Sequence, residues 1–289
     1  MDIRNMNTCP TPNGTLLVIG GHENKGEAAE KKVQEGDDFH PLEILRTFVD
    51  LTGKKEPVIE VVTTASAEGA ESFQDYVKAF KELELSSIGH IHHDKRADAL
   101  TGDALERISK ADGIFLSGGD QLKLTSVYGG TSFLFTLKQR YIFDGLVIGG
   151  TSAGAMAMST PMIFAGNKAA QQIAGEVKIT TGLEFLKDVC IDTHFVDRGR
   201  FVRMAQVIAT NPTCIGMGIE EDTAIIVRNG IEAEVIGSGI VIVIEGFHIS
   251  DSNILNFGED EKIFIHDLNV KLLSKGSTYI IPQNNPPHL

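Results

Sequence analysis

Short apolar runs rich in valine and isoleucine alternate along the chain with longer segments in which apolar residues recur every three or four positions. The runs are typical of buried strands and the longer segments of helices that cover a sheet. Strands are predicted at Thr15–Ile19, Val58–Val62, Gly113–Leu116, Leu146–Ile148, Val189–Ile191 and Cys214–Met217. Helices are predicted at His40–Leu51, Ser72–Leu83, Ala99–Lys110, Ser132–Tyr141 and Phe201–Ala209. This alternation predicts an α/β fold, a three-layer αβα sandwich with a mainly parallel central sheet.

The pattern changes after Ile219. Ala224–Val227 and Ile231–Ile236 are predicted to be two strands joined by the turn at residues 228–230, and Ile240–Ile244 to be a third. The C-terminal third is therefore expected to be more antiparallel. With 289 residues, 42% of them hydrophobic, we expect one domain over residues 1–289. Loose segments are expected at 1–13, 22–38 and 282–289.

The composition limits the partners and the compartment. A net charge of −13 argues against nucleic acid as a partner, because a phosphate backbone would be repelled. No apolar stretch approaches the roughly 20 residues that cross a bilayer, and the first residues lack the apolar part of a signal peptide. Cys9, Cys190 and Cys214 show neither CxxC nor zinc spacing, which fits a reducing compartment. We therefore expect a cytoplasmic protein without a membrane partner, with Cys190 and Cys214 as core thiols.

A candidate nucleophile lies in the sequence Gly-Thr-Ser-Ala-Gly at residues 150–154, which follows the strand Leu146–Ile148. A strand, a sharp turn and a helix of small residues form the context in which a serine hydroxyl is lifted above a sheet edge. Ser152 would then be the nucleophile, and the N–H of Ala153 could stabilise an oxyanion. A serine in a plain glycine-rich connection is the alternative.

A serine nucleophile needs a base and an orienting acid, and His194 follows another predicted strand. Ligands collect beyond the carboxyl ends of strands in open α/β sheets, where both Ser152 and His194 are expected. Residues 218–223 supply three acids after the strand Cys214–Met217, and spacing does not choose among them. A rival order is Ser152, Asp192 and His248, which is less favoured because His248 lies in the strand-rich last third.

Three further clusters could carry chemistry. Gly118 and Gly119 end a central strand and could present backbone N–H groups to an oxyanion, although a tight turn explains them nearly as well. Neither GGH at 20–22 nor GGD at 118–120 fits a nucleotide-binding fingerprint, so no cofactor is expected. The histidines of residues 90–93 are predicted to be solvated surface rather than metal ligands, and no metal is expected.

Arginines follow the candidate base closely. Arg200 and Arg203 share a predicted helix face at a spacing of three, and guanidinium groups there could bind a substrate carboxylate bidentately. Surface ion pairs with the many acidic residues explain these arginines, and Arg198 before them, about as well.

Four motifs occur in an order that resembles the cyanophycinase family: GGDQ at 118–121, GGTSAGA at 149–155, DTHF at 192–195 with RGR at 198–200, and GMGIEEDTA at 216–224. The resemblance spans about residues 14–245. It implies a serine peptidase fold related to peptidase E and to class I glutamine amidotransferases. The triad that it implies is Ser152, His194 and Glu221. Its substrate-binding positions are Gln121, Asp192, Thr193, Arg198, Arg200 and Arg203.

The resemblance also implies an activity: hydrolysis of cyanophycin, a polyaspartate that carries arginine on each side chain, to β-aspartyl-arginine dipeptides. A homodimer is expected on the same ground. Thr193 departs from the glutamine that often precedes the base in this family, and Glu220 stands where an aspartate is common. The alternative is a peptidase E-like enzyme that cleaves short Asp-Xaa peptides.

Overall fold

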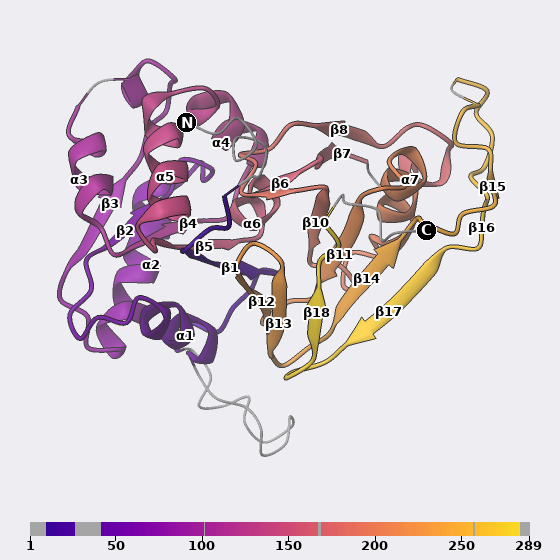
Figure 1. The fold of residues 1–289 in the computed structure, drawn as a ribbon. Coiled ribbons are helices and arrows are strands. Elements are labelled where there is room, and N and C mark those ends of the chain that lie inside the picture. The colour runs from indigo at the N-terminus through magenta and orange to yellow at the C-terminus, as the bar shows by residue number, and fades with distance from the viewer. Residues whose placement is uncertain (1–9, 27–41, 101, 167–168, 257, 284–289) are drawn as a thin grey trace, which may run out of the picture.

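The protein is described by a computed structural model that covers residues 10–26, 42–100, 102–166, 169–256 and 258–283 (Figure 1). Its α-helices are α1 (Glu43–Leu51), α2 (Gly69–Glu82), α3 (Ala104–Lys110), α4 (Gln121–Tyr128), α5 (Ser132–Phe143), α6 (Ala153–Ala157) and α7 (Phe201–Thr210). Short 3-10 turns occupy Asp98–Leu100 and Ala170–Gln172. Within the described ranges, no helix is long and apolar enough to cross a membrane.

The larger sheet has the order β18-β13-β12-β1-β5-β4-β2-β3. Its strands are β1 (Thr15–Ile19), β2 (Ile59–Val62), β3 (Ile88–Ile91), β4 (Gly113–Leu116), β5 (Val147–Thr151), β12 (Thr223–Arg228), β13 (Glu232–Gly237) and β18 (Thr278–Ile280). Strands β1, β5, β4, β2 and β3 are parallel, whereas β12, β13 and β18 join them in antiparallel pairing. The predicted α/β fold with a mainly parallel sheet and an antiparallel C-terminal third is thus confirmed.

Helices cover both faces of this sheet. Because alternate residues of a strand face opposite sides, β1 contributes to two separate cores. Leu17 packs in one core with Phe48 of α1 and Phe80 of α2, and Leu16 lies in the other with Ile108 of α3 and the helices that follow it. Burying apolar side chains on both faces produces the three predicted layers.

Three of the predicted strands, Val189–Ile191, Cys214–Met217 and Ile240–Ile244, lie in a second sheet instead of the larger one. This sheet has the order β17-β14-β11-β10-β6-β9. Its strands are β6 (Ser159–Thr160), β9 (Leu186–Lys187), β10 (Val189–Thr193), β11 (Ile215–Ile219), β14 (Val241–Glu245) and β17 (Asn269–Leu273). Apolar runs predict strands but not which strands pair. Helix α7 packs against this sheet (Figure 1), and the free thiols of Cys190 and Cys214 are buried there as predicted.

The structure also contains small elements that the sequence pattern did not predict. Two-stranded sheets join β7 (Met162–Ala165) to β8 (Lys178–Thr180) and β15 (Asp251–Ser252) to β16 (Ile265–His266). The predicted helix Ala99–Lys110 is split into a 3-10 turn and α3, and α4 was not predicted because its apolar residues lack a clear helical period. Some predictions lie outside the described residues: His40, the ends of both predicted tails and most of the charged stretch 22–38.

The strand ends bring the candidate residues together. Strands β1, β5 and β4 of the larger sheet and β10 and β11 of the second sheet all continue into the loops that carry the predicted chemistry. The connection at residues 220–222 leads from β11 in one sheet to β12 in the other. The candidate site therefore lies at the junction of the two sheets, at the carboxyl ends of parallel strands.

Candidate active site

Ser152 lies on a strained turn between β5 and α6. Its backbone angles are φ 50° and ψ −113°, a left-handed conformation that a residue other than glycine rarely adopts. The turn requires glycine on its far side, because a Cβ on Gly154 would lie 2.2 Å from the carbonyl oxygen of Leu116. Because α6 approaches β4 this closely, the position two residues after Ser152 must be glycine. The geometry is that of a nucleophile elbow.

A continuous chain of hydrogen bonds runs from the serine to a carboxylate. Ser152 Oγ lies 2.9 Å from His194 Nε2, and His194 Nδ1 lies 2.5 Å from Glu221 Oε1. The His194 side chain is only 3% exposed, and its residue also has a positive φ of 49°. Hydroxyl, imidazole and carboxylate thus have the arrangement that activates a serine for nucleophilic attack.

The structure distinguishes the three acids that follow β11. Glu220 accepts a hydrogen bond from the N–H of Ile240 at 2.6 Å, and Asp222 accepts one from the N–H of Asn24 at 3.0 Å. Of these three acids, Glu221 is the one that contacts His194. Glu220 and Asp222 therefore stabilise the surrounding loops, and Glu221 faces the imidazole.

One short segment at the end of β1 supports all three loops. The carbonyl oxygens of Ile19, Gly20 and Gly21 accept hydrogen bonds from the N–H groups of Ser152, His194 and Asp222, at 3.1, 2.8 and 2.9 Å. Gly21 has a φ of 102°, and a Cβ there would lie 2.4 Å from the His194 ring. Sequence reasoning missed this role because GGH was tested only as a nucleotide-binding motif. Its place directly after a central strand was the available signal.

A buried carboxylate supports the elbow from the cavity side. Glu23 accepts hydrogen bonds from the Thr151 hydroxyl at 2.5 Å and from the Tyr76 hydroxyl at 2.6 Å. Only 5% of Glu23 is exposed, so these bonds replace the water that its oxygens would otherwise bind. The interaction connects the loop after β1 with β5 and with α2.

The electrostatics keep the base neutral and the acid ionised. Burial lowers the pKa of His194 below its ordinary 6.5, and the charges of Arg198 and His22 lower it further, whereas the hydrogen bond to Glu221 acts in the opposite direction. Burial raises the pKa of Glu221, but its hydrogen bonds and its attraction to His194 and His22 outweigh this and lower the pKa overall. A neutral imidazole beside a carboxylate can accept the serine proton near neutral pH.

Three of these side chains also have the composition of a metal site. Donor atoms of His22, His194 and Glu221 lie within 4.8 Å of one another. However, Glu221 lies at direct hydrogen-bonding distances from both imidazoles, 2.5 Å to His194 and 2.9 Å to His22. Zinc would need about 2.0–2.2 Å to each donor and would have to replace both hydrogen bonds. We therefore assign proton chemistry to this group.

The serine opens into a polar cavity of about 890 Å³. Its charged lining includes Lys25 and Arg198 on one hand and Asp75 on the other, while Gly118 and Gly119 lie beside the serine. The full lining is His22, Glu23, Asn24, Lys25, Ser72, Asp75, Tyr76, Gly118, Gly119, Thr151, Ser152, His194 and Arg198. A ligand with both positive and negative groups would find partners in this cavity.

Most of the predicted substrate-binding residues are engaged inside the protein. Arg203 donates to Asp192 through both Nε and Nη2, and Arg200 donates to the same carboxylate at 2.9 Å. Asp192 is fully buried, and the bidentate pairing of Arg203 occurs with this protein carboxylate. Thr193 is buried too, and its hydroxyl has no partner among the described residues.

Gln121 and the rival triad are also placed elsewhere. The Gln121 side chain donates to the carbonyl oxygen of Ile163 at 2.8 Å and does not line the cavity. Asp192, the acid of the rival order, is paired with arginines, and His248 is exposed beyond β14 and absent from the cavity lining. Of the six predicted substrate positions, Arg198 is the one that lines the cavity.

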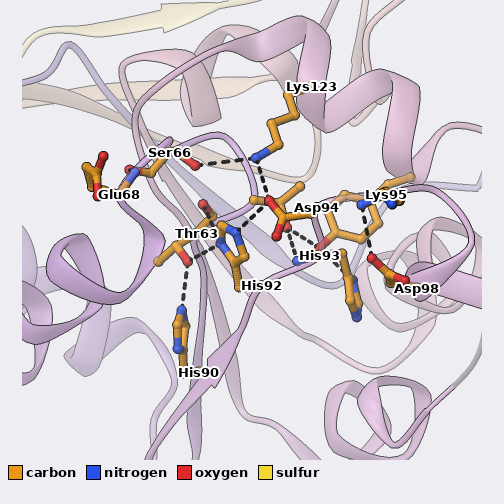
Figure 2. A network of polar contacts seen from close by, with 12 residues as sticks. Thr63, Ser66, Glu68, His90, His92, His93, Asp94, Lys95, Asp98 and Lys123 are labelled. Carbon is orange, nitrogen blue, oxygen red and sulfur yellow. Dashed lines mark hydrogen bonds and ion pairs between the residues drawn. The ribbon is translucent and has the colours of Figure 1, made fainter.

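The predicted solvated histidines form a hydrogen-bonded network at the end of β3 instead (Figure 2). His90 Nε2 and His92 Nδ1 lie 2.7 and 2.9 Å from the hydroxyl of Thr63, and His93 Nδ1 lies 3.1 Å from the hydroxyl of Tyr128. Asp94 completes the network by contacting both His92 and a lysine of α4 (Figure 2). These contacts stabilise the loop after β2, and the prediction of a plain solvated strand was wrong.

Comparison with known proteins identifies a family and relatives that match the part of the chain that contains the four motifs. A sequence profile described as Peptidase family S51 matches residues 32–235. The cyanophycinase of Synechococcus elongatus is 30% identical over 275 residues, which cover 95% of this chain and 81% of the relative. The cyanophycinase of Trichormus variabilis is 30% identical over 276 residues, covering 94% and 88%. A crystal structure of a peptidase from an acI-B1 actinobacterium superposes with a TM-score of 0.65 at 19% identity, covering 94% of this chain and 98% of the other, and shows the same fold.

Proposed function

The chain belongs to peptidase family S51 and is a serine-type peptidase, and from this we propose that it degrades cyanophycin to β-aspartyl-arginine dipeptides with Ser152, His194 and Glu221 as its catalytic triad. The observation that carries the proposal is the hydrogen-bond chain from Ser152 Oγ through His194 to Glu221, which begins in a cavity lined by charges of both signs. Relatives that are named cyanophycinase and cover nearly the whole chain support the choice of substrate.

In the proposed reaction, Ser152 Oγ attacks an aspartyl carbonyl carbon while His194 Nε2 takes the hydroxyl proton. The tetrahedral oxyanion accepts hydrogen bonds from the N–H of Ala153 and of Gly118 or Gly119. As the carbon–nitrogen bond breaks, His194 returns its proton to the leaving amine. Water then attacks the acyl-enzyme, again with His194 as the base. Glu221 keeps the imidazole oriented and stabilises its cationic form.

The cavity provides groups for a substrate that carries carboxylates and guanidinium groups together. Arg198 and Lys25 would attract the free α-carboxylate of the branching arginine, and Asp75 would attract its guanidinium group. Asp192, Arg200 and Arg203, by contrast, would act indirectly, since their mutual pairing supports the strand end that carries His194. Arg198 is therefore the residue that we propose for direct contact among the three arginines.

The proposal is tested with purified protein and its Ser152→Ala variant. Both are incubated with cyanophycin, and the release of β-aspartyl-arginine is followed by mass spectrometry. We expect release by the native protein and a loss on the order of 10⁴-fold or more in the variant, which keeps the elbow because alanine is small. Equal release by the two proteins would overturn the assignment of the nucleophile.

The substrate is tested separately from the nucleophile. A fluorophosphonate probe labels an activated serine whatever the substrate of the enzyme is. Labelling of Ser152 together with absence of dipeptide release from cyanophycin would overturn the polymer as substrate, and short aspartyl peptides would then be tried. Release from short Asp-Xaa peptides alone would favour the peptidase E-like alternative.

A further inference from the structure

The carboxylate of Glu221 contacts two histidines at once. Its Oε1 lies 2.5 Å from His194, and its Oε2 lies 2.9 Å from Nδ1 of His22, which follows β1 by three residues. The two imidazole rings meet edge to face, with centroids 4.9 Å apart and planes at 79°. An ionised carboxylate can only accept, so His22 must donate its Nδ1 hydrogen to Glu221.

The backbone around His22 is built to hold this contact. His22 has a positive φ of 48°, a conformation that is uncommon outside glycine and that asparagine, aspartate and histidine adopt more readily than other residues. The preceding Gly21 accepts from the N–H of Asp222, and two residues later Asn24 donates its N–H to the side chain of Asp222. The loop that carries His22 is thus attached on both sides to the loop that carries Glu221.

Glu221 needs such support because it is not enclosed. Its side chain is 28% exposed, against 3% for His194, and the Oε2 oxygen faces His22 at the wall of the cavity. Without a donor on Oε2, the carboxylate could rotate about its last torsion, which is a broad and shallow one, and present either oxygen to solvent. A donor on Oε2 fixes the orientation in which Oε1 faces the base.

We propose that His22 is a positioning residue of the catalytic triad, which donates a hydrogen bond to the free oxygen of Glu221 and so holds that carboxylate against His194. This inference rests on the proposed function of Ser152, His194 and Glu221. His22 meets the His194 ring only edge to face and gives its hydrogen bond to Glu221, so its proposed role is to orient that carboxylate. The triad thereby becomes a four-residue chain of serine, histidine, glutamate and a second histidine.

Three substitutions separate the hydrogen bond from the bulk of the ring. His22→Asn keeps a donor near the position of Nδ1 and tolerates a positive φ. His22→Phe keeps a ring but removes the donor, and His22→Ala removes both. We expect Phe and Ala to slow both fluorophosphonate labelling of Ser152 and kcat on cyanophycin about tenfold at pH 7, with a smaller change in KM. The Asn variant should stay within about twofold of the native rates.

The pH profile gives a readout that a purely structural role would not move. The groups around the pair are Glu221, His194 and Arg198, with Glu23 and Lys25 on the cavity wall. The hydrogen bond to Glu221 raises the pKa of His194, and this bond should weaken when the donor on Glu221 is lost. The Phe and Ala variants should therefore move the acid limb of the labelling rate to lower pH. Thermal unfolding of each variant checks that the fold is intact.

The outcomes are distinct from those of the proposed function. If Ser152→Ala abolishes labelling and His22→Phe labels at the native rate with an unshifted acid limb, the inference is wrong and the triad stands. If His22→Asn is as slow as His22→Phe, the donor is not what matters and the inference is again wrong. If Ser152→Ala is still labelled at the native rate, the triad fails and the inference fails with it.

Discussion

Two regions of this molecule combine histidine with a carboxylate and a hydroxyl, and they differ in their surroundings. Around Ser152, the partners stand in a row beside a cavity, and both Ser152 and His194 have strained backbone angles. Around Thr63, the histidines pair within the protein and among regular backbone, next to an edge strand (Figure 2). The comparison indicates that strain and an open cavity, rather than the residue types, mark the reactive region.

After loss of the serine itself, the largest effect is expected from the triad acid. Replacing Glu221 by Gln should lower kcat about 1,000- to 10,000-fold, because an amide does not stabilise the imidazolium and can favour the wrong tautomer. Glu220→Gln is the matched control, since its side chain can still accept the Ile240 N–H and kcat should change less than about twofold. Steady-state kinetics on cyanophycin measure both. Similar losses in the two variants would refute the distinction between these neighbouring acids.

The strained segment after β1 should show the next largest effect. In Gly21→Ala, the new Cβ would lie 2.4 Å from the His194 ring, so the imidazole must shift. We expect kcat/KM to fall about 100-fold, the usual consequence of a misplacement near 1 Å. Gly53→Ala is the control, because Gly53 also has a positive φ, 65°, but has no atom within 4 Å of the added Cβ. A native rate in Gly21→Ala would show that His194 tolerates displacement.

Sequence alone predicted the parts of this site that follow local rules. The elbow at Ser152 and the base at His194 were predicted because each follows an apolar run, and the carboxyl ends of parallel strands collect ligands. The choice of Glu221 came from resemblance alone, since spacing left three acids open. The structure distinguishes them through contacts with Ile240, Asn24 and the base.

What the sequence did not predict depends on long-range pairing. The strands that lead into His194 and Glu221 lie in a second sheet, and apolar runs carry no information about which strands pair. Likewise, Arg203 was predicted as a partner for a substrate carboxylate, and its pairing with Asp192, eleven residues earlier, was not predicted. A guanidinium recognises any carboxylate, so only the fold decides whether the partner belongs to the protein.

The acid limb of the pH profile should report the lowered pKa of His194. As the pH falls through the pKa of His194, the imidazole gains a proton and can no longer accept one from Ser152. Burial lowers that pKa, so kcat/KM should remain high down to a pH below 6.5 and fall only there. The labelling rate of Ser152 should follow the same limb, since it does not depend on ionisation of the substrate. A midpoint above 6.5 in both measurements would show that burial does not control this group.

The smallest effect on turnover is expected in the histidine network. His92→Ala removes contacts to the hydroxyl and carbonyl of Thr63 and to Asp94, so unfolding should require about 1 kcal/mol less free energy. Asp94→Ala is the control, because that side chain is 72% exposed and its ion pairs contribute less. Denaturant unfolding measures both, and kcat should stay within about twofold of the native value in each. Because the network only stabilises a loop, a loss of turnover in His92→Ala that exceeds its loss of stability would make this region part of the active site and end the contrast drawn above.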